Sequence, residues 1–185
     1  MLMLYMSLVE TPEEKDKFEE LYYQYRALMH YCAKEILKDD GLAEDAVHNA
    51  FIKIIRFLDK IGDVRCNKTK RFIVIVVENC AKDIYRKRKN EMEVSWEEVE
   101  MAYQFPCKND VEELSEVETA IMELPLNYRQ IFILKYAHGY SCKEIATILS
   151  MKAGTVRQRI ARGKECLYEN LKEKGVYIDG KNDNR

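Results

Sequence analysis

The residues best suited to chemistry lie near the C-terminus, in the basic segment 155–164. Its polar side chains fall outside the apolar spacing of that segment and are Thr155, Arg157, Gln158, Arg159 and Arg162. Arg and Gln carry forked donors and acceptors that match guanine and adenine edges in the major groove, and each such contact discriminates by about 1–3 kcal/mol. A Thr at a helix start is suited to meet a phosphate. This chemistry is recognition of duplex DNA, with a merely solvated basic face as the alternative.

The surrounding pattern predicts how these side chains are positioned. Val156, Ile160 and Gly163 recur at helical spacing and give the segment an inner face. Upstream, Ser141 and Glu144 have the S-x-x-E form of a capping box, which starts a separate helix. A short break at 150–154 lies between the two, and Leu124-Pro125 opens an earlier helix that ends at His138-Gly139-Tyr140. The order of a helix, a short turn and a second helix predicts a helix-turn-helix. This motif favours DNA recognition over a merely solvated basic face.

A second basic region covers residues 65–90, with nine basic and two acidic residues and a net charge of +7. Within it, 72–77 is β-branched and aromatic and favours a strand by propensity, but the apolar spacing continues to Ile84 and predicts a buried helix. Residues 61–70 are expected to form a loop. A basic loop before a basic helix end suits phosphate contact and capture of a single strand, although cations favour helix C-termini in any case. The polar residues of this region that we expect to face DNA are Asn67, Lys68, Asn79, Asp83, Arg86 and Lys87.

The rest of the chain organises these two regions. Apolar stripes at 18–37 and 46–58 predict two more helices, separated by Asp39-Asp40-Gly41, which we expect to stop the first. Residues 91–118 hold ten acidic residues and one basic residue, a net charge of −9, and predict a linker. The expected fold class is all-α, with two small helical domains joined by an acidic linker and a C-terminal helix-turn-helix. The expected boundaries are 10–90 and 118–175 for the domains, 91–117 for the linker and 176–185 for a tail.

Composition excludes several classes of protein. With 7 Gly and 3 Pro in 185 residues, an all-β sandwich or barrel with many tight turns is hard to build. Six dispersed cysteines without a C-x-x-C pair exclude a zinc ribbon and a disulfide framework, so reduced thiols are expected. The apolar N-terminus is too short to span a membrane and lacks the basic start of a signal peptide, which predicts a cytoplasmic protein. No catalytic constellation, metal site or cofactor motif is present in the sequence, so an enzyme is not expected.

Taken together, the motifs resemble those of bacterial sigma factors of the extracytoplasmic-function type, the small two-domain branch of the sigma-70 family. The similarity covers roughly 18–90 and 118–171. The segment 43–51 resembles the family's core-polymerase-binding helix, and 72–79 with Asp83 and Arg86 resembles its promoter-melting segment. The third and most specific match joins Leu124-Pro125, Ser141, Glu144-Ile145-Ala146 and Gly154-Thr155-Val156-Arg157, which resemble the domain that reads the −35 element.

The resemblance implies a sigma factor that binds RNA polymerase core and directs promoter-specific initiation through −10 and −35 elements. The helix expected over 155–164, the recognition helix, would read the −35 element. The residues of the 65–90 region would contact the −10 element, and the 61–70 loop would hold a flipped base. The residues implied for polymerase binding are Asp45, Asn49, Phe51 and Ile55. Partners would be RNA polymerase core and promoter DNA, without membrane insertion, and the sequence leaves open whether an anti-sigma factor exists.

Two other functions compete with this interpretation. A stand-alone helix-turn-helix regulator would bind duplex DNA without polymerase, whereas a helical adaptor would ignore −35 mutations. The sequence also departs from the family pattern: Phe72 replaces a usual Trp, Glu78 a usual basic residue, and Ser150 and Lys152 the usual turn Gly and capping Ser. These departures concern the −10 pocket and the start of the recognition helix.

Overall fold

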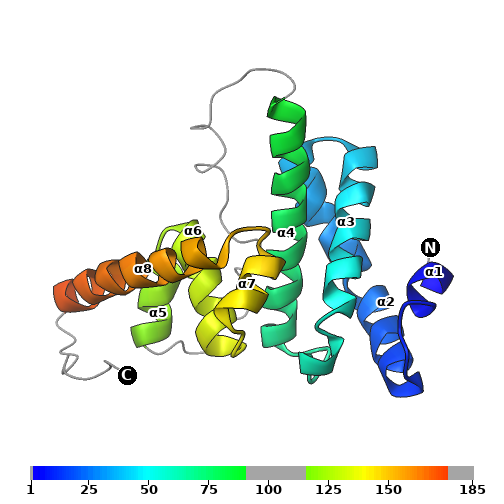
Figure 1. Cartoon of the computed structure of the whole chain (residues 1–185), viewed down its shortest axis with the longest axis horizontal. Coiled ribbons are helices and arrows are strands. Elements are labelled where there is room, and N and C mark those ends of the chain that lie inside the picture. The colour runs from blue at the N-terminus through cyan, green and yellow to red at the C-terminus, as the bar shows by residue number, and fades with distance from the viewer. Residues whose placement is uncertain (1, 91–115, 175–185) are drawn as a thin grey trace. The chain divides into compact units, whose positions relative to one another are not determined.

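The computed structural model describes residues 2–90 and 116–174 and divides them into two compact units. The first unit holds α1 to α4, and the second holds α5, α6, η3, most of α7, and α8 (Figure 1). Every regular element in these two ranges is helical, which confirms the expected all-α class. Most of the predicted acidic linker, the single Trp96 and the predicted tail lie outside the described residues.

Two helices of the first unit begin at side-chain caps. In α2 (Pro12–Leu37), the Thr11 hydroxyl accepts a hydrogen bond from the Glu14 amide, and Pro12 occupies the first turn, where its missing N–H is tolerated. In α3 (Asp40–Ile55), the Asp39 carboxylate accepts from the Leu42 amide at 2.9 Å. We expected Asp39-Asp40-Gly41 to stop the first helix, and the break does fall here but earlier in the chain: the left-handed Lys38 ends α2, and Asp39 caps the start of α3.

The third long helix, α4 (Asn67–Asn90), packs side by side with α2 and α3 (Figure 1). The segment 72–77 lies within it, and each of its six side chains is at most 1% exposed. The prediction of a buried helix is therefore confirmed over that of a strand. A helix covered on most sides needs no polar stripe, so its sequence resembles the continuous apolar run of a buried strand.

Before α2, the short helix α1 (Leu2–Met6) adds an element that the sequence patterns did not predict. Tyr5 is 1% exposed, and its ring lies 5.7 Å from Phe18 of α2 and 5.3 Å from Phe51 of α3, centroid to centroid. Its hydroxyl makes a 2.8 Å hydrogen bond with Nδ1 of His48. The core of the first unit therefore includes a residue that precedes the expected domain start at residue 10.

The second unit is built from short helices that precede one longer helix. Its elements are α5 (Glu116–Glu123), α6 (Leu126–Phe132), the π-helical turn η3 (Ile133–Ala137), α7 (Cys142–Ile148) and α8 (Ala153–Glu173). The capping box at the start of α7 is confirmed: the Ser141 amide donates to the Glu144 carboxylate at 2.9 Å, and the Glu144 amide donates to the Ser141 hydroxyl at 3.3 Å.

The turn between α7 and α8 is shorter than the expected break at 150–154, because α8 already begins at Ala153. Ser150 takes a left-handed conformation with φ of 51°, which is a conformation that favours glycine. Lys152 occupies the N-cap position of α8 without a capping side-chain bond. Ser150 and Lys152 are two of the departures from the sigma pattern. The usual Gly at the turn adopts the left-handed conformation more easily, and the usual Ser at the cap can bond the start of the helix.

Candidate nucleic-acid interface

The helix α8 presents its polar side chains as the sequence predicted. Val156 is fully buried and Gly163 is buried, whereas Arg157, Gln158 and Arg162 are exposed. Thr155 and Arg159 are half-buried at the edge of this face. The exposed side chains therefore form a basic strip with one amide, starting in the first turn of a 21-residue helix. A helix of this kind fits the width of the major groove.

A close helix crossing holds α8 in place. A Cβ built on Gly163 would lie 2.6 Å from Cε2 of Phe132 and 3.3 Å from Cβ of Tyr128, both on α6. A side chain at this position would force either the Phe132 ring or the packing of α6 on α8 to shift. The start of α6 is fixed in turn by Arg129, whose guanidinium donates to the Leu124 carbonyl at 3.0 and 3.2 Å. The absence of a side chain at Gly163 thus allows α6 to approach closely the helix that carries the basic strip.

The C-terminal half of α4 forms the second basic surface. Arg86 and Lys87 are exposed, and Arg86 lies 3.4 Å from the Asp83 carboxylate, which is also 3.9 Å from Nζ of Lys53 on α3. Asn79 does not belong to this surface. It is 8% exposed, and its amide donates to the Ile75 carbonyl of its own helix at 2.7 Å. We correct its expected role as a DNA contact, because helical spacing alone does not fix the width of the open face.

The expected loop 61–70 is shorter in the structure. Residues 61–66 connect η1 (Leu58–Lys60) to α4, and 67–70 form the first turn of α4, so the prediction was wrong for these four residues. Asn67 is half-buried, and Lys68 is exposed at the start of the helix. Two basic ends therefore belong to one helix: Lys68 at its start and Arg86 and Lys87 near its end.

The residues that the resemblance implied for polymerase binding separate into two groups on α3. Asp45 and Asn49 are exposed and lie four residues apart on one face, and Ile55 is half-buried at the helix end. Phe51 is fully buried, and its ring lies 5.1 Å from Tyr22 and 5.7 Å from Phe18. We correct its expected role, because a side chain enclosed by α1 and α2 does not reach a partner without opening the core.

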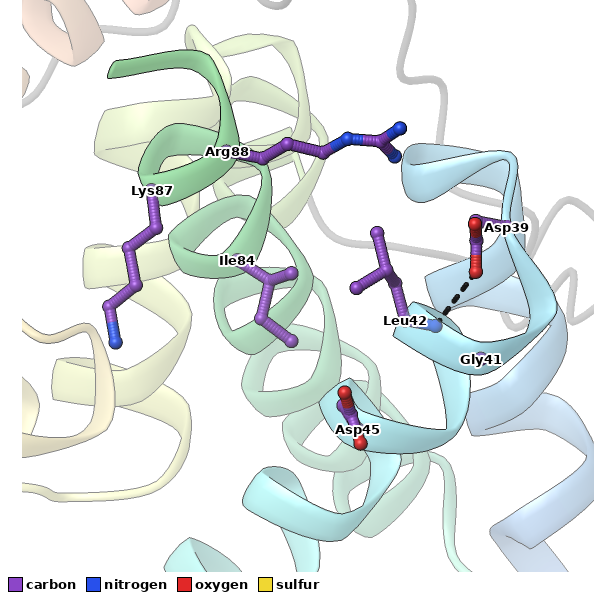
Figure 2. Close-up of a pocket in the computed structure, with 7 residues that line it drawn as sticks. All are labelled: Asp39, Gly41, Leu42, Asp45, Ile84, Lys87 and Arg88. Atoms are coloured by element: carbon purple, nitrogen blue, oxygen red, sulfur yellow. Dashed lines mark hydrogen bonds between the residues drawn. The ribbon is translucent and has the colours of Figure 1, made fainter. Parts of the chain in front are cut away.

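A cleft of about 680 Å³ lies between the start of α3 and the end of α4. Figure 2 shows Arg88 reaching from α4 toward the start of α3, with Leu42 and Ile84 between the two helices. Carboxylates lie on the α3 side and cations on the α4 side, and the lining residues are Asp39, Gly41, Leu42, Asp45, Ile84, Lys87 and Arg88. The cleft therefore adjoins one residue expected to meet polymerase and one expected to meet DNA.

Two buried groups of the first unit, Tyr5 and Cys80, have pKa values shifted toward the neutral form. Burial raises the pKa of the Tyr5 phenol and of the Cys80 thiol above their ordinary values. At the surface, the hydrogen bond from Lys34 lowers the pKa of Asp40. Within 2–90 and 116–174, no three His, Cys, Asp or Glu side chains gather as metal ligands, and no helix is long and apolar enough to cross a membrane.

Two all-helical units, one of them carrying an exposed basic strip on the second helix of a helix-turn-helix, are features typical of a DNA-binding protein. The family model for sigma-70 region 2 matches residues 21–91, and that for sigma-70 region 4 matches residues 114–167. The chain belongs to the sigma-70 family, in its extracytoplasmic-function branch, and is a promoter-specific initiation factor associated with RNA polymerase rather than a stand-alone regulator.

Two named relatives and one solved structure are similar to this chain over most of its length. The extracytoplasmic-function sigma factor SigW of Bacillus subtilis is 27% identical over 173 residues, covering 86% of this chain and 91% of SigW. SigM of the same organism is 26% identical, covering 89% of this chain and 98% of SigM. Among solved structures, the sigma factor RpoE of Bartonella quintana, crystallised with the anti-sigma factor NepR, is 23% identical with a TM-score of 0.38, covering 84% of this chain and 96% of RpoE.

Proposed function

We propose that this chain reads the −35 element with α8 and the −10 element with α4 and the 61–66 loop. The observation that carries the proposal is the exposed strip on α8, seated by the buried Val156 and Gly163. The −35 contacts are Arg157, Gln158, Arg159 and Arg162, with Thr155 near a phosphate. The −10 contacts are Asn67, Lys68, Asp83, Arg86 and Lys87, and a non-template base is received by the loop.

The same proposal assigns the chain a binding partner, RNA polymerase core, and a cellular compartment. The docking residues for RNA polymerase core are Asp45 and Asn49, together with Ile55 at the end of α3. Asp45 and Asn49 lie on the polar face of α3 that α1 and α2 leave open. The chain itself carries out no catalysis: bond formation belongs to the polymerase, and this subunit supplies sequence recognition and holds the opened strand. A protein with these partners acts in the cytoplasm.

Arg162→Ala tests the reading of −35. A bidentate base contact is worth about 1–3 kcal/mol, so the variant should lower run-off transcription by core polymerase about 5- to 160-fold at promoters with the matching −35 sequence. Promoters already substituted at that base pair should respond weakly. Lys172→Ala, an exposed change near the other end of α8, is the control and should leave both promoters unaffected. An equal loss on every template would indicate a phosphate contact instead.

Asp45→Ala tests polymerase docking. Removing an exposed carboxylate that pairs across an interface should weaken co-purification with core enzyme, without changing the unfolding curve of the free protein. Glu44→Ala is the matched control, because this neighbouring carboxylate already pairs with Arg26 of α2 at 3.1 Å. Core binding that is unchanged in Asp45→Ala, or weakened equally in both variants, would reject the proposed role of Asp45.

A further inference from the structure

The loop 61–66 is held in place by side chains of α2, which lies far from it in the sequence. Nζ of Lys17 donates to the Ile61 carbonyl at 2.8 Å and approaches the Leu58 carbonyl at 3.5 Å. The buried hydroxyl of Tyr25 donates to the Val64 carbonyl at 2.7 Å. These bonds fix the main chain directly, so they depend on the path of the loop and not on its side chains.

A second set of bonds joins the loop to the start of α4, to Glu20 of α2 and within itself. The Asp63 carbonyl accepts from the Thr69 hydroxyl at 2.7 Å and from the Cys66 thiol at 3.2 Å. The Asp63 carboxylate accepts from the Arg65 amide at 2.8 Å, and the Arg65 guanidinium lies 2.8 Å from Glu20 of α2. The loop is therefore tied at each end and across its middle.

The exposure of the loop residues shows what this scaffold presents. Ile61 and Val64 are 5% and 4% exposed and insert into the unit, whereas Gly62 and Asp63, which lie between them, are exposed. A Cβ on Gly62 would meet nothing within 4 Å, so the space above this point of the main chain is open. The result is a short open platform with a fixed backbone.

A fixed backbone has a direct consequence for binding. A loop that is ordered only when its ligand arrives lowers the apparent affinity by the fraction of time it spends in the binding-competent form. A loop that is ordered beforehand avoids this loss, which takes the largest share of the binding free energy for a ligand that makes few contacts, such as one unstacked base.

We propose that Tyr25 and Lys17 are positioning residues for promoter opening: they hold the 61–66 loop in the shape that receives the non-template base of the −10 element. The proposal rests on the proposed function of this loop and adds the residues that preset it. Neither side chain touches DNA in this arrangement. Both act through main-chain carbonyls, at Val64 and at Ile61.

The test compares promoters that differ only in one non-template base of the −10 element. Holoenzyme is assembled with the wild type, Tyr25→Phe or Lys17→Met, and open complexes are measured by permanganate reactivity. At the position read by the loop, both variants should lower opening about fivefold with the best base and much less with the worst base, because only a base that the loop holds loses affinity when the loop is rarely preset. Hydrogen exchange at amides 62–66 should become faster.

Tyr23→Phe is the matched control, because it removes a hydroxyl from the same helix on a side chain that is 69% exposed. It should leave the base ratio and the exchange rates unchanged, and dependence on the −35 sequence should be the same in all four proteins. If Tyr25→Phe and Lys17→Met lower opening equally for every base, their role is only structural and the proposal is overturned. If the wild type shows no base preference at any −10 position, the proposed function of the loop itself fails.

Discussion

Gly163 determines how closely the DNA-facing helix packs against the rest of its unit. The position lies in the interior of α8, where glycine is the poorest helix former after proline, so helix propensity does not explain its presence. The Phe132 ring does explain it, because its Cε2 would lie 2.6 Å from a Cβ at position 163. Because Phe132 is itself 2% exposed, the ring has little room to move aside.

Gly163→Ala is therefore expected to destabilise the second unit by about 1–3 kcal/mol, the usual effect of overpacking, despite the better helix propensity of alanine. Gly154→Ala is the matched control in the same helix, since a Cβ at that position would meet nothing within 4 Å. That change should leave stability unaltered or raise it by up to about 1 kcal/mol. Urea unfolding followed by circular dichroism measures both. Equal stability of the two variants would show that the contact with Phe132 relaxes freely.

At the scale of elements, α1 packs N-terminal residues against α3, the helix proposed to bind polymerase. Tyr5 packs on Phe51, and its hydroxyl bonds His48 on α3. His48 lies three residues after Asp45 on α3, so α1 covers a side of this helix that is next to the proposed docking surface. Losing α1 would expose the ring of Phe51 and loosen the helix that carries the docking residues.

Tyr5→Ala should destabilise the first unit by about 3–5 kcal/mol, as for other buried aromatic side chains, whereas Tyr5→Phe should cost about 0.5–1.5 kcal/mol for the hydrogen bond. Met3→Ala, at a side chain 84% exposed, is the control and should have little effect. Urea unfolding at neutral pH measures all three. An unaltered midpoint in Tyr5→Ala would show that α1 contributes nothing to the core.

The same variants carry a pH dependence. Burial raises the pKa of Tyr5 above its ordinary value of 10.0, so the folded state holds this proton more tightly than the unfolded state does. The resulting stability is fully present below the unfolded pKa and is lost as the pH rises through the folded pKa. The stability difference between wild type and Tyr5→Phe should therefore shrink from neutral pH to about pH 11.

At the scale of the whole molecule, the net charge of −2 hides three sequence blocks whose net charges alternate in sign. Residues 65–90 carry +7, 91–118 carry −9, and 143–174 carry +4, counted as eight basic against four acidic residues. Both basic blocks include the surfaces proposed to meet DNA. An acidic block between them is expected to screen these surfaces in the free protein and to disfavour DNA binding without polymerase.

Replacing Glu97, Glu98 and Glu100 by Gln should raise the affinity of the free protein for promoter duplex by a factor on the order of 2–10 at low salt. The gain should fade above about 0.1 M salt, where the Debye length is near 10 Å. Changing three exposed acids of α2, Glu13, Asp16 and Glu19, to their amides gives the same charge change as a control. Gel shifts measure both sets. Equal gains would reflect net charge alone and reject screening by this block.

The sequence by itself determined the helical class, the helix-turn-helix, the capping box at Ser141 and the buried character of 72–77. Each is a local property, because the 3.6-residue period and the hydrogen bonds of a cap involve residues only three or four positions apart. The same locality explains why Arg157, Gln158 and Arg162 were correctly expected to be exposed. Their helix is covered on one side, and its apolar residues mark that side.

Only the tertiary structure decided which of the remaining polar and aromatic residues are open. Phe51 and Asn79 share helical spacing with exposed neighbours, but they are buried, and Phe51 is enclosed by α1 and α2. The bonds from Lys17 and Tyr25 to the 61–66 loop join residues about forty positions apart, and no periodicity encodes them. Burial and long-range hydrogen bonds depend on which elements pack together, and this is fixed by the whole chain and not by any one segment.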